Sequence, residues 1–222
     1  MIQLISLVTL AFTMSMCGLD KERATESSAQ MVSAKNNVQL DKLSKAYFAS
    51  GCFWCVESIF ESVRGVEEAI SGYSGGKEQN PTYRQVSYGR TSHAEAVEVY
   101  YDPKIVDYKT LVTVFYGSHD PTTVDGPHPD YGRQYRSMIY YQNDEEQRIA
   151  EEFKAGLESS GTYKKPIATE IVPFEKFWIA EDYHQDYERN NPNQPYVRTV
   201  SVPRLKKFQS KFPELLKEEL NH

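Results

Sequence analysis

Cysteine is scarce in this sequence: only Cys17, Cys52 and Cys55 occur among 222 residues. Three thiols cannot build a disulfide scaffold, and a chain of this length can bury an adequate core without one. Basic side chains are also in deficit, because 25 Lys and Arg stand against 31 Asp and Glu and leave a net charge of −6. That balance argues against a nucleic-acid-binding protein, which needs clustered positive charge. No apolar run is long enough to span a bilayer.

The N-terminal segment carries features of an export signal. Its first sixteen residues contain no charged side chain and have the length of a signal-peptide core. They lead to Cys17 in a setting similar to a bacterial lipoprotein cleavage site, although no Lys or Arg precedes the apolar run and Met16 stands where a small residue is usual. We predict a signal peptide at 1–17, lipidation of Cys17, and an exported protein of the cell envelope that Cys17 tethers to the membrane. The alternative is a cytoplasmic protein with an uncleaved N-terminal segment.

Beyond Cys17 the composition predicts a tether followed by one folded domain. Residues 18–44 are rich in Lys, Glu, Ser, Ala, Asn and Gln, which is typical of a linker. The domain is expected at 45–222, where segments with the spacing of strands and of helices alternate. Strands are predicted at 45–51, 65–70, 94–101, 138–141 and 167–173, and helices at 52–63, 108–115 and 143–157. A further helical stretch at 205–220 is interrupted at Pro213, and long loops are expected at 72–81 and 119–136. These elements indicate a mixed α and β class.

A short motif after the first predicted strand contains two cysteines that could take part in a reaction. Gly51 closes the strand, and the Cys-x-x-Cys motif of Cys52 and Cys55 opens the next helix. A thiolate at a helix N-terminus is stabilised by unpaired backbone N–H groups and the helix dipole, which lower its pKa. Because Cys52 is nearer that end, we predict Cys52 as the nucleophile. Cys55 lies within reach to close a disulfide with Cys52.

The motif by itself leaves other interpretations open. A zinc site would need four ligands, and neither His93 nor His184 stands at a supporting spacing. A thioredoxin-like disulfide oxidoreductase shares the strand and the Cys-x-x-Cys order, although the bulky residues between the cysteines make a binding wall and not a flat exchange surface. Two buried structural cysteines, or a cysteine-bearing binding module without activity, are the other interpretations. The glycines at 72–76 lack the spacing of a phosphate-binding or dinucleotide loop, and nothing indicates a metal, nucleotide or flavin.

Motifs along the whole domain are similar to those of the A-type peptide methionine sulfoxide reductases. Gly51-Cys-Phe-Trp-Cys55 resembles the signature of that family, and the similarity runs in order from about Lys45 to Phe212. Cys55 departs from the pattern, since most of the family has Gly there and a subgroup has Cys. The chain also lacks the C-terminal cysteines of other members. The further matching motifs are Gly72-Tyr-Ser-Gly-Gly76, Asn80-Pro-Thr-Tyr83, His93-Ala-Glu95-Ala-Val97, Tyr101-Asp-Pro103, His119-Asp-Pro121, Gln134-Tyr-Arg-Ser137 and Ala180-Glu-Asp-Tyr-His-Gln185.

The resemblance implies a fold and a reaction. The fold would be an α+β two-layer mixed sheet with flanking helices and a ferredoxin-like core. The reaction would be thiol-dependent reduction of methionine S-sulfoxide, protein-bound or free, in which Cys52 attacks the sulfur and Glu95 donates a proton to the departing oxygen. Tyr83 and Tyr135 would hydrogen-bond that oxygen in a network with Asp130. Sequence alone would put Glu95 on a solvated strand face, and only the resemblance places it in a pocket that raises its pKa.

The resemblance also implies how substrate is held and how the enzyme is reset. Phe53 and Trp54 match the apolar wall that takes the methionine methyl group. Cys55 would be the resolving cysteine, forming a disulfide with the nucleophile that thioredoxin or a similar dithiol reduces, so that no cofactor or metal is expected. His184 would give structural support and take no part in catalysis. We expect the protein to be a monomer.

Overall fold

The computed structural model of the chain describes residue 40 and residues 42–220. The predicted signal peptide, Cys17 and most of the predicted linker lie outside this part. One compact unit begins at Leu43, close to the predicted start of the folded domain. Within the described part, no helix combines the length and the apolar character that crossing a bilayer requires.

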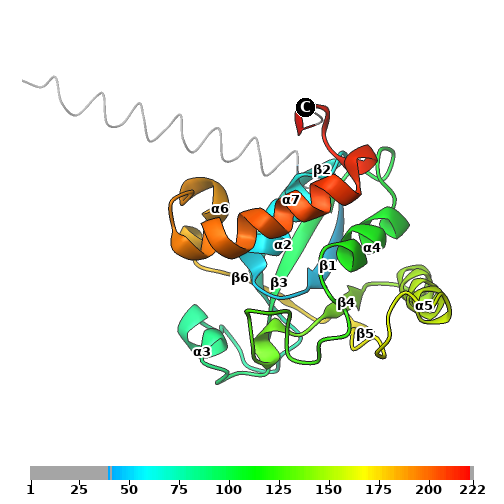
Figure 1. The fold of residues 1–222 in the computed structure, drawn as a ribbon. Coiled ribbons are helices and arrows are strands. Elements are labelled where there is room, and N and C mark those ends of the chain that lie inside the picture. Colours follow the sequence, from blue (N-terminus) through cyan, green and yellow to red (C-terminus); the bar gives the residue numbers. More distant parts are fainter. Residues whose placement is uncertain (1–39, 41, 221–222) are drawn as a thin grey trace, which may run out of the picture. The chain divides into compact units, whose positions relative to one another are not determined.

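A single mixed sheet of six strands forms the centre of the unit (Figure 1). The strands are β1 (Ser44–Ala49), β2 (Val66–Ser74), β3 (Ala94–Tyr101), β4 (Met138–Tyr141), β5 (Glu170–Pro173) and β6 (Phe177–Ile179). They lie in the order β5-β4-β1-β3-β2-β6, and all neighbours are antiparallel except the parallel pair of β4 and β5. The α+β prediction is confirmed, whereas the ferredoxin-like label stays a prediction.

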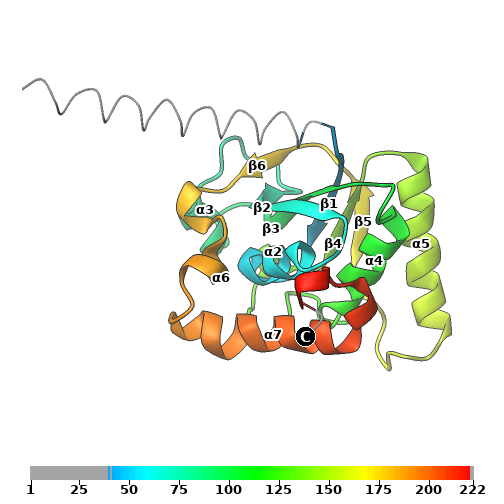
Figure 2. The same cartoon turned by 90° about the horizontal axis from the view of Figure 1, so that it is seen from above.

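The helices are α2 (Phe53–Glu61), α3 (Tyr83–Ser87), α4 (Tyr108–Gly117), α5 (Asp144–Ser159), α6 (Tyr187–Asn190) and α7 (Val202–Lys211). Of these, α2, α4 and α5 pack on the strands and cover one face of the sheet. The ring of Phe48 in β1 contacts Phe60 of α2 and Phe115 of α4, at centroid distances of 4.9 and 5.5 Å. α7 packs against α2 (Figure 2). On the opposite face, Tyr47 stacks on Phe174 at 3.8 Å, so both faces of the sheet are covered.

The position of β3 in the sheet decides where its carboxyl groups lie. All eight residues of this central strand are buried. Alternation places Glu95 on the same face as Val97 and Val99, which belong to the core under the helices. The solvated position that sequence alone suggests for Glu95 is therefore wrong, because a strand in mid-sheet with both faces covered has no solvated side. Glu95 is buried, as the resemblance implied.

Two predictions near the sheet edges are wrong. The loop predicted at 72–81 begins later, since β2 continues to Ser74 and pairs with β6, a strand that the sequence did not reveal. Gly72 permits this pairing, because a Cβ there would lie 2.3 Å from the ring of Phe177 and 2.4 Å from the carbonyl oxygen of Trp178. The strand predicted at 167–173 is also shorter and begins at Glu170.

Candidate active site

The start of α2 holds both thiols of the Cys-x-x-Cys motif. Cys52 is the N-cap residue, and Cys55 lies in the first turn, where its N–H donates to the Cys52 carbonyl oxygen over 3.1 Å. Both are free cysteines, 6% and 0% exposed respectively. The predicted nucleophile therefore keeps a small opening to solvent, whereas its predicted resolving partner is enclosed.

A buried carboxyl group lies beside this turn. Glu95 is 1% exposed, and its Oε2 accepts a hydrogen bond from the backbone N–H of Phe53 over 3.1 Å. Burial raises the pKa of Glu95 to about 8; the Phe53 hydrogen bond opposes this change, and the nearby Asp130 adds to it. Glu95 is therefore protonated in most molecules at pH 7, which is the state that a proton donor needs.

The two thiols differ in acidity. Burial raises the pKa of the Cys52 thiol well above its usual value, and the hydrogen bond with Cys55 acts in the same direction. The same hydrogen bond lowers the pKa of Cys55 to about 7 against the effect of burial, with a smaller contribution from the positive charge of Arg204. Burial and the neighbouring negative charges of Cys55, Glu95 and Asp130 therefore oppose the stabilisation that the helix N-terminus gives a thiolate at Cys52. The sequence argument that Cys52 is the more acidic thiol stays a prediction.

Asp130 reaches the site from the long loop between α4 and β4. Its Oδ2 accepts from the backbone N–H of Cys52 at 3.4 Å, and both carboxylate oxygens lie 2.8 Å from the donating hydroxyl of Tyr196. That hydroxyl is also 3.9 Å from Sγ of Cys55. Tyr196 is a site residue that sequence reasoning missed. It is one of sixteen tyrosines, stands outside every matching motif, and gave no signal that could have separated it from the others.

The two tyrosines expected to bind the sulfoxide oxygen come from different segments. Tyr83 is the first residue of α3, and Tyr135 ends a 3-10 turn in the loop between α4 and β4. Burial raises the pKa of both phenols, and for each the negative charges of Glu95 and Cys52 are the next causes. The fold therefore brings both tyrosines near the predicted proton donor and the predicted nucleophile.

Aromatic side chains surround the motif. Phe53 is 1% exposed and its ring stacks with that of Tyr83 at 6.2 Å. Trp54 is partly buried, lies flat on Tyr187 at 3.8 Å, and donates from Nε1 to Nδ1 of His184 over 3.1 Å. Because Nδ1 of His184 accepts this hydrogen bond, the proton of the neutral ring is on Nε2. Burial lowers the pKa of this histidine to about 4, so the ring is neutral at pH 7. A neutral His184 that orients the indole agrees with the structural role expected for it.

One group of side chains in the described part could supply metal ligands. Carboxylate oxygens of Glu57, Glu61 and Asp186 lie within 4.8 Å of one another. Glu57 already accepts hydrogen bonds from the hydroxyl of Ser71 and the backbone N–H of Asp186, and burial raises its pKa to about 8. These bonds tie α2 to β2 and to the segment before α6, which is a structural role.

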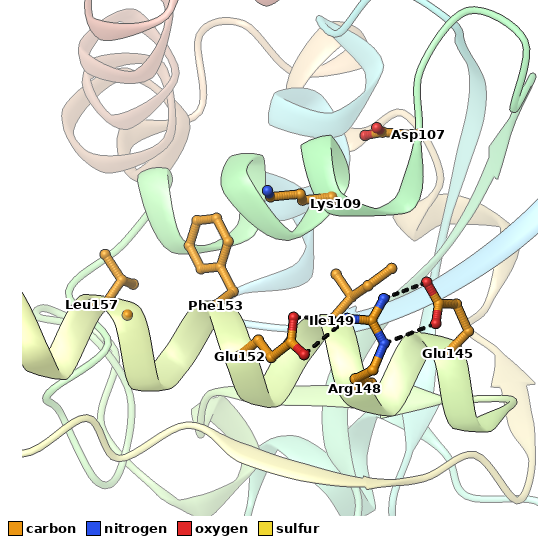
Figure 3. A pocket seen from close by; sticks show the side chains of 9 residues that line it. Asp107, Lys109, Glu145, Arg148, Ile149, Glu152, Phe153 and Leu157 are labelled. Atoms are coloured by element: carbon orange, nitrogen blue, oxygen red, sulfur yellow. Dashed lines mark hydrogen bonds and ion pairs between the residues drawn. The ribbon is translucent and has the colours of Figure 1, made fainter.

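A hollow between α4 and α5 lies apart from the thiols. It measures about 650 Å³, and Ile149 and Phe153 supply apolar side chains to it (Figure 3). Arg148 pairs there with Glu145 and Glu152 on the same helix. The lining contains none of the residues predicted to act in catalysis.

Comparison with known proteins agrees with the geometry of the site. A family model described as peptide methionine sulfoxide reductase matches residues 44–216. The chain belongs to this family. It is 47% identical over 173 residues to the peptide methionine sulfoxide reductase MsrA 1 of Rhodopirellula baltica, which covers 78% of this chain and 88% of that one. To the MsrA of Methanosarcina mazei it is 46% identical over 175 residues, covering 77% and 83%.

Solved structures of the family share the fold. Mxr1 from Saccharomyces cerevisiae in reduced form superposes with a TM-score of 0.64 at 31% identity, covering 68% of this chain and 87% of that one. Methionine sulfoxide reductase A of Corynebacterium diphtheriae gives a TM-score of 0.61 at 36% identity, covering 68% and 76%. Membership in the A-type peptide methionine sulfoxide reductase family decides among the interpretations that the Cys-x-x-Cys motif left open.

Tyr196→Phe should weaken this methionine sulfoxide reductase without unfolding it. The change removes the hydroxyl that donates to Asp130 and approaches Cys55. A hydrogen bond to a charged group contributes about 1.5–3 kcal/mol, so kcat/KM should fall by about 10- to 150-fold if the bond persists in the transition state. Tyr131→Phe is the matched control, because Tyr131 follows Asp130 directly but is 81% exposed. Equal losses in the two variants would remove Tyr196 from the site.

Proposed function

We propose that this chain reduces the S epimer of methionine sulfoxide, protein-bound or free, and thereby repairs oxidised proteins. One pairing carries the proposal: the thiol of Cys52 lies at the start of α2 beside Glu95, a buried carboxylic acid that is protonated at pH 7. Sulfoxide reduction needs these two groups, because a soft nucleophile must attack sulfur while a proton reaches the departing oxygen. The family gives the same reaction, and the choice of the S epimer rests on its A type.

The first step consumes one thiolate and one proton. Near neutral pH the thiol pair carries a negative charge on Cys55, whose pKa is about 7. Cys52 becomes the thiolate when its proton passes along the hydrogen bond to Cys55, and its sulfur then attacks the sulfoxide sulfur. Glu95 gives its proton to the oxygen of this adduct, and the resulting hydroxyl group moves from the substrate sulfur to Sγ of Cys52. The bond between the two sulfur atoms breaks, methionine leaves, and Cys52 is left as a sulfenic acid.

Aromatic and polar groups around Cys52 hold the substrate. Phe53 and Trp54 accept the methyl group beside the sulfur, since methyl and thioether groups pack favourably on aromatic rings. Tyr83 and Tyr135 donate hydrogen bonds to the sulfoxide oxygen. Their phenols stay protonated throughout the neutral range because burial raises the pKa of each.

Cys55 resolves the sulfenic acid. It lies one helical turn from Cys52, so its thiol condenses with the sulfenic acid, water leaves, and a disulfide forms. A dithiol of the thioredoxin type then attacks this disulfide through a mixed disulfide and leaves in oxidised form. The two electrons that convert sulfoxide to methionine therefore come from that dithiol.

A pair of assays tests the function. With dithiothreitol as reductant, the full chain should convert methionine S-sulfoxide to methionine and leave the R epimer unchanged. In parallel, insulin disulfides should be reduced no faster than by dithiothreitol alone. Insulin reduction without sulfoxide reduction would assign a thioredoxin-like oxidoreductase. Absence of both activities would assign a binding module.

We also propose that the chain is exported and tethered to the membrane through lipidated Cys17. The proposal rests on the uncharged apolar sequence that precedes Cys17 and on the polar composition of 18–44. Cell fractionation should recover the protein with the envelope, and Cys17→Ser should release it into the soluble fraction. Recovery of cytosolic protein with its N-terminal methionine intact would contradict export.

A further inference from the structure

A groove of about 870 Å³ lies between α7 and the loop that follows α4. Its lining comes from residues 117–129, from Tyr163 and from the segment 199–211. Apolar side chains supply much of this lining, among them Pro127, Pro129 and Val200. The groove contains none of the residues that the proposed mechanism uses.

Positive charge gathers in this groove although the chain as a whole carries −6. Arg204, Lys207 and Lys211 line it from α7, and Asp120 is the one acidic residue in the lining. No ion pair involving the three basic side chains occurs within the described residues. The guanidinium of Arg204 donates to the carbonyl oxygen of Ser118 over 2.9 Å, which holds the side chain without cancelling its charge.

The groove adjoins the nucleophile. Arg204 donates to the carbonyl oxygen of Ser50 over 2.8 Å, two residues before Cys52. A Cβ on Gly51 would lie 2.8 Å from Cγ of Pro127 and 3.2 Å from Nη1 of Arg204, so the groove wall touches the backbone that carries Cys52. The turn 127–130 joins the two regions, because Pro127 lines the groove and Asp130 accepts from the backbone N–H of Cys52.

We propose that this groove binds the polypeptide segment next to the oxidised methionine and favours acidic side chains in that segment. The inference rests on the proposed function, since a protein substrate whose sulfoxide reaches Cys52 must lay its flanking residues on the adjoining surface. The apolar lining takes backbone and aliphatic groups, and Lys207 and Lys211 pair with carboxylates. The preference should differ between the two flanks of the oxidised methionine. A second groove, lined by Trp54 and by other residues of α7, contains several acidic residues, including Glu61 and Glu68.

Peptide substrates of matched length test the groove. Each of three peptides carries one methionine S-sulfoxide. The first has Asp residues on the N-terminal side of it and the second has them on the C-terminal side. The third has Lys in place of Asp. With dithiothreitol as reductant and low salt, one of the Asp peptides should have the highest kcat/KM. Lys207→Glu/Lys211→Glu should lower that value by about 2- to 30-fold, the range for losing two exposed ion pairs. The difference should fade as salt is raised, because exposed charges are screened.

Controls separate this inference from the function on which it rests. Lys206→Glu changes an exposed charge of α7 outside the groove lining and should leave the peptide preference intact. Free methionine S-sulfoxide should be reduced equally by all variants, because it has no flanking segment.

Failure of the wild-type protein to reduce free methionine S-sulfoxide would reject the proposed function. Normal reduction of it with equal rates for Asp and Lys peptides would reject the groove alone. A higher KM of the double variant for thioredoxin, with unchanged peptide kinetics, would assign the groove to the reductant and overturn the proposal.

Discussion

Cys52→Ser should abolish sulfoxide reduction with every reductant, whereas Cys55→Ser should release about one methionine per molecule and then stop when thioredoxin is the reductant. The difference follows from the places of the two thiols. Cys52 caps α2 beside Glu95 and keeps an opening to solvent, and Cys55 is fully enclosed behind it. A serine hydroxyl at position 52 cannot attack sulfur, but a serine at position 55 removes only the partner that converts the sulfenic acid to a disulfide.

Mass spectrometry after one turnover should separate the two roles. The wild-type protein should show a bridge between Cys52 and Cys55, and the Cys55→Ser protein should show a sulfenic acid on Cys52 that a dimedone-type reagent traps. Dithiothreitol should restore repeated turnover to Cys55→Ser, because a small thiol can reach the sulfenic acid directly. Cys17→Ser is the matched control and should keep full thioredoxin-dependent activity. Full thioredoxin-dependent turnover by Cys55→Ser would instead make Cys55 a structural residue.

The hydrogen bond between the two thiols also affects how fast Cys52 reacts with an alkylating reagent. Burial and the hydrogen bond with Cys55 both raise the pKa of Cys52, and the same hydrogen bond lowers the pKa of Cys55. Substitution of Cys55 removes the hydrogen bond that raises the pKa of Cys52. The remaining thiol should therefore react faster with such a reagent at pH 7 in Cys55→Ser than in the wild-type protein. The helix N-terminus then acts on Cys52 without competition from a neighbouring thiolate.

Local features of the fold were predictable because their causes lie within a few residues. Asp107 and Asn143 cap α4 and α5 by accepting from backbone N–H groups three residues ahead, as their side-chain chemistry indicates. α2 begins directly after Cys52, where the apolar spacing predicted a helix. α7 ends at Lys211, two residues before Pro213 begins a separate 3-10 turn.

Features that depend on distant segments were not predictable from spacing. Asp130 and Tyr196 are far apart in the chain and meet only because the loop after α4 and the segment before α7 converge on the start of α2. The pairing of β6 with β2 depends on what Gly72 meets across the sheet edge, and a sequence pattern does not show that neighbour. The acidity of Cys52 likewise depends on how deeply α2 is covered. The resemblance supplied the roles of Glu95 and Tyr83 where local chemistry could not.

Glu95→Gln should lower kcat by about 10²- to 10⁴-fold, the range for losing a general acid. The variant should fold, because the amide oxygen of Gln can still accept the hydrogen bond that the backbone N–H of Phe53 donates to the carboxyl group. KM should change less than kcat, since Phe53 and Trp54 hold the methyl group in both proteins. The amide cannot supply the proton that the departing oxygen needs, so the loss should concentrate in the chemical step.

The pH dependence of the reduction rate tests whether Glu95 is the proton donor. Because burial raises its pKa to about 8, the protonated form predominates below that pH and is lost above it. The wild-type rate should therefore rise at first as the thiol pair loses a proton near pH 7 and then fall as Glu95 ionises, giving a bell-shaped dependence. In Glu95→Gln the alkaline limb should vanish while the acid limb persists. An alkaline limb retained in the Gln variant would mean that another group donates the proton, and Tyr83 and Tyr135 would then be the candidates. Loss of the acid limb instead would mean that ionisation of Glu95, and not of the thiol pair, produces the rise in rate at low pH.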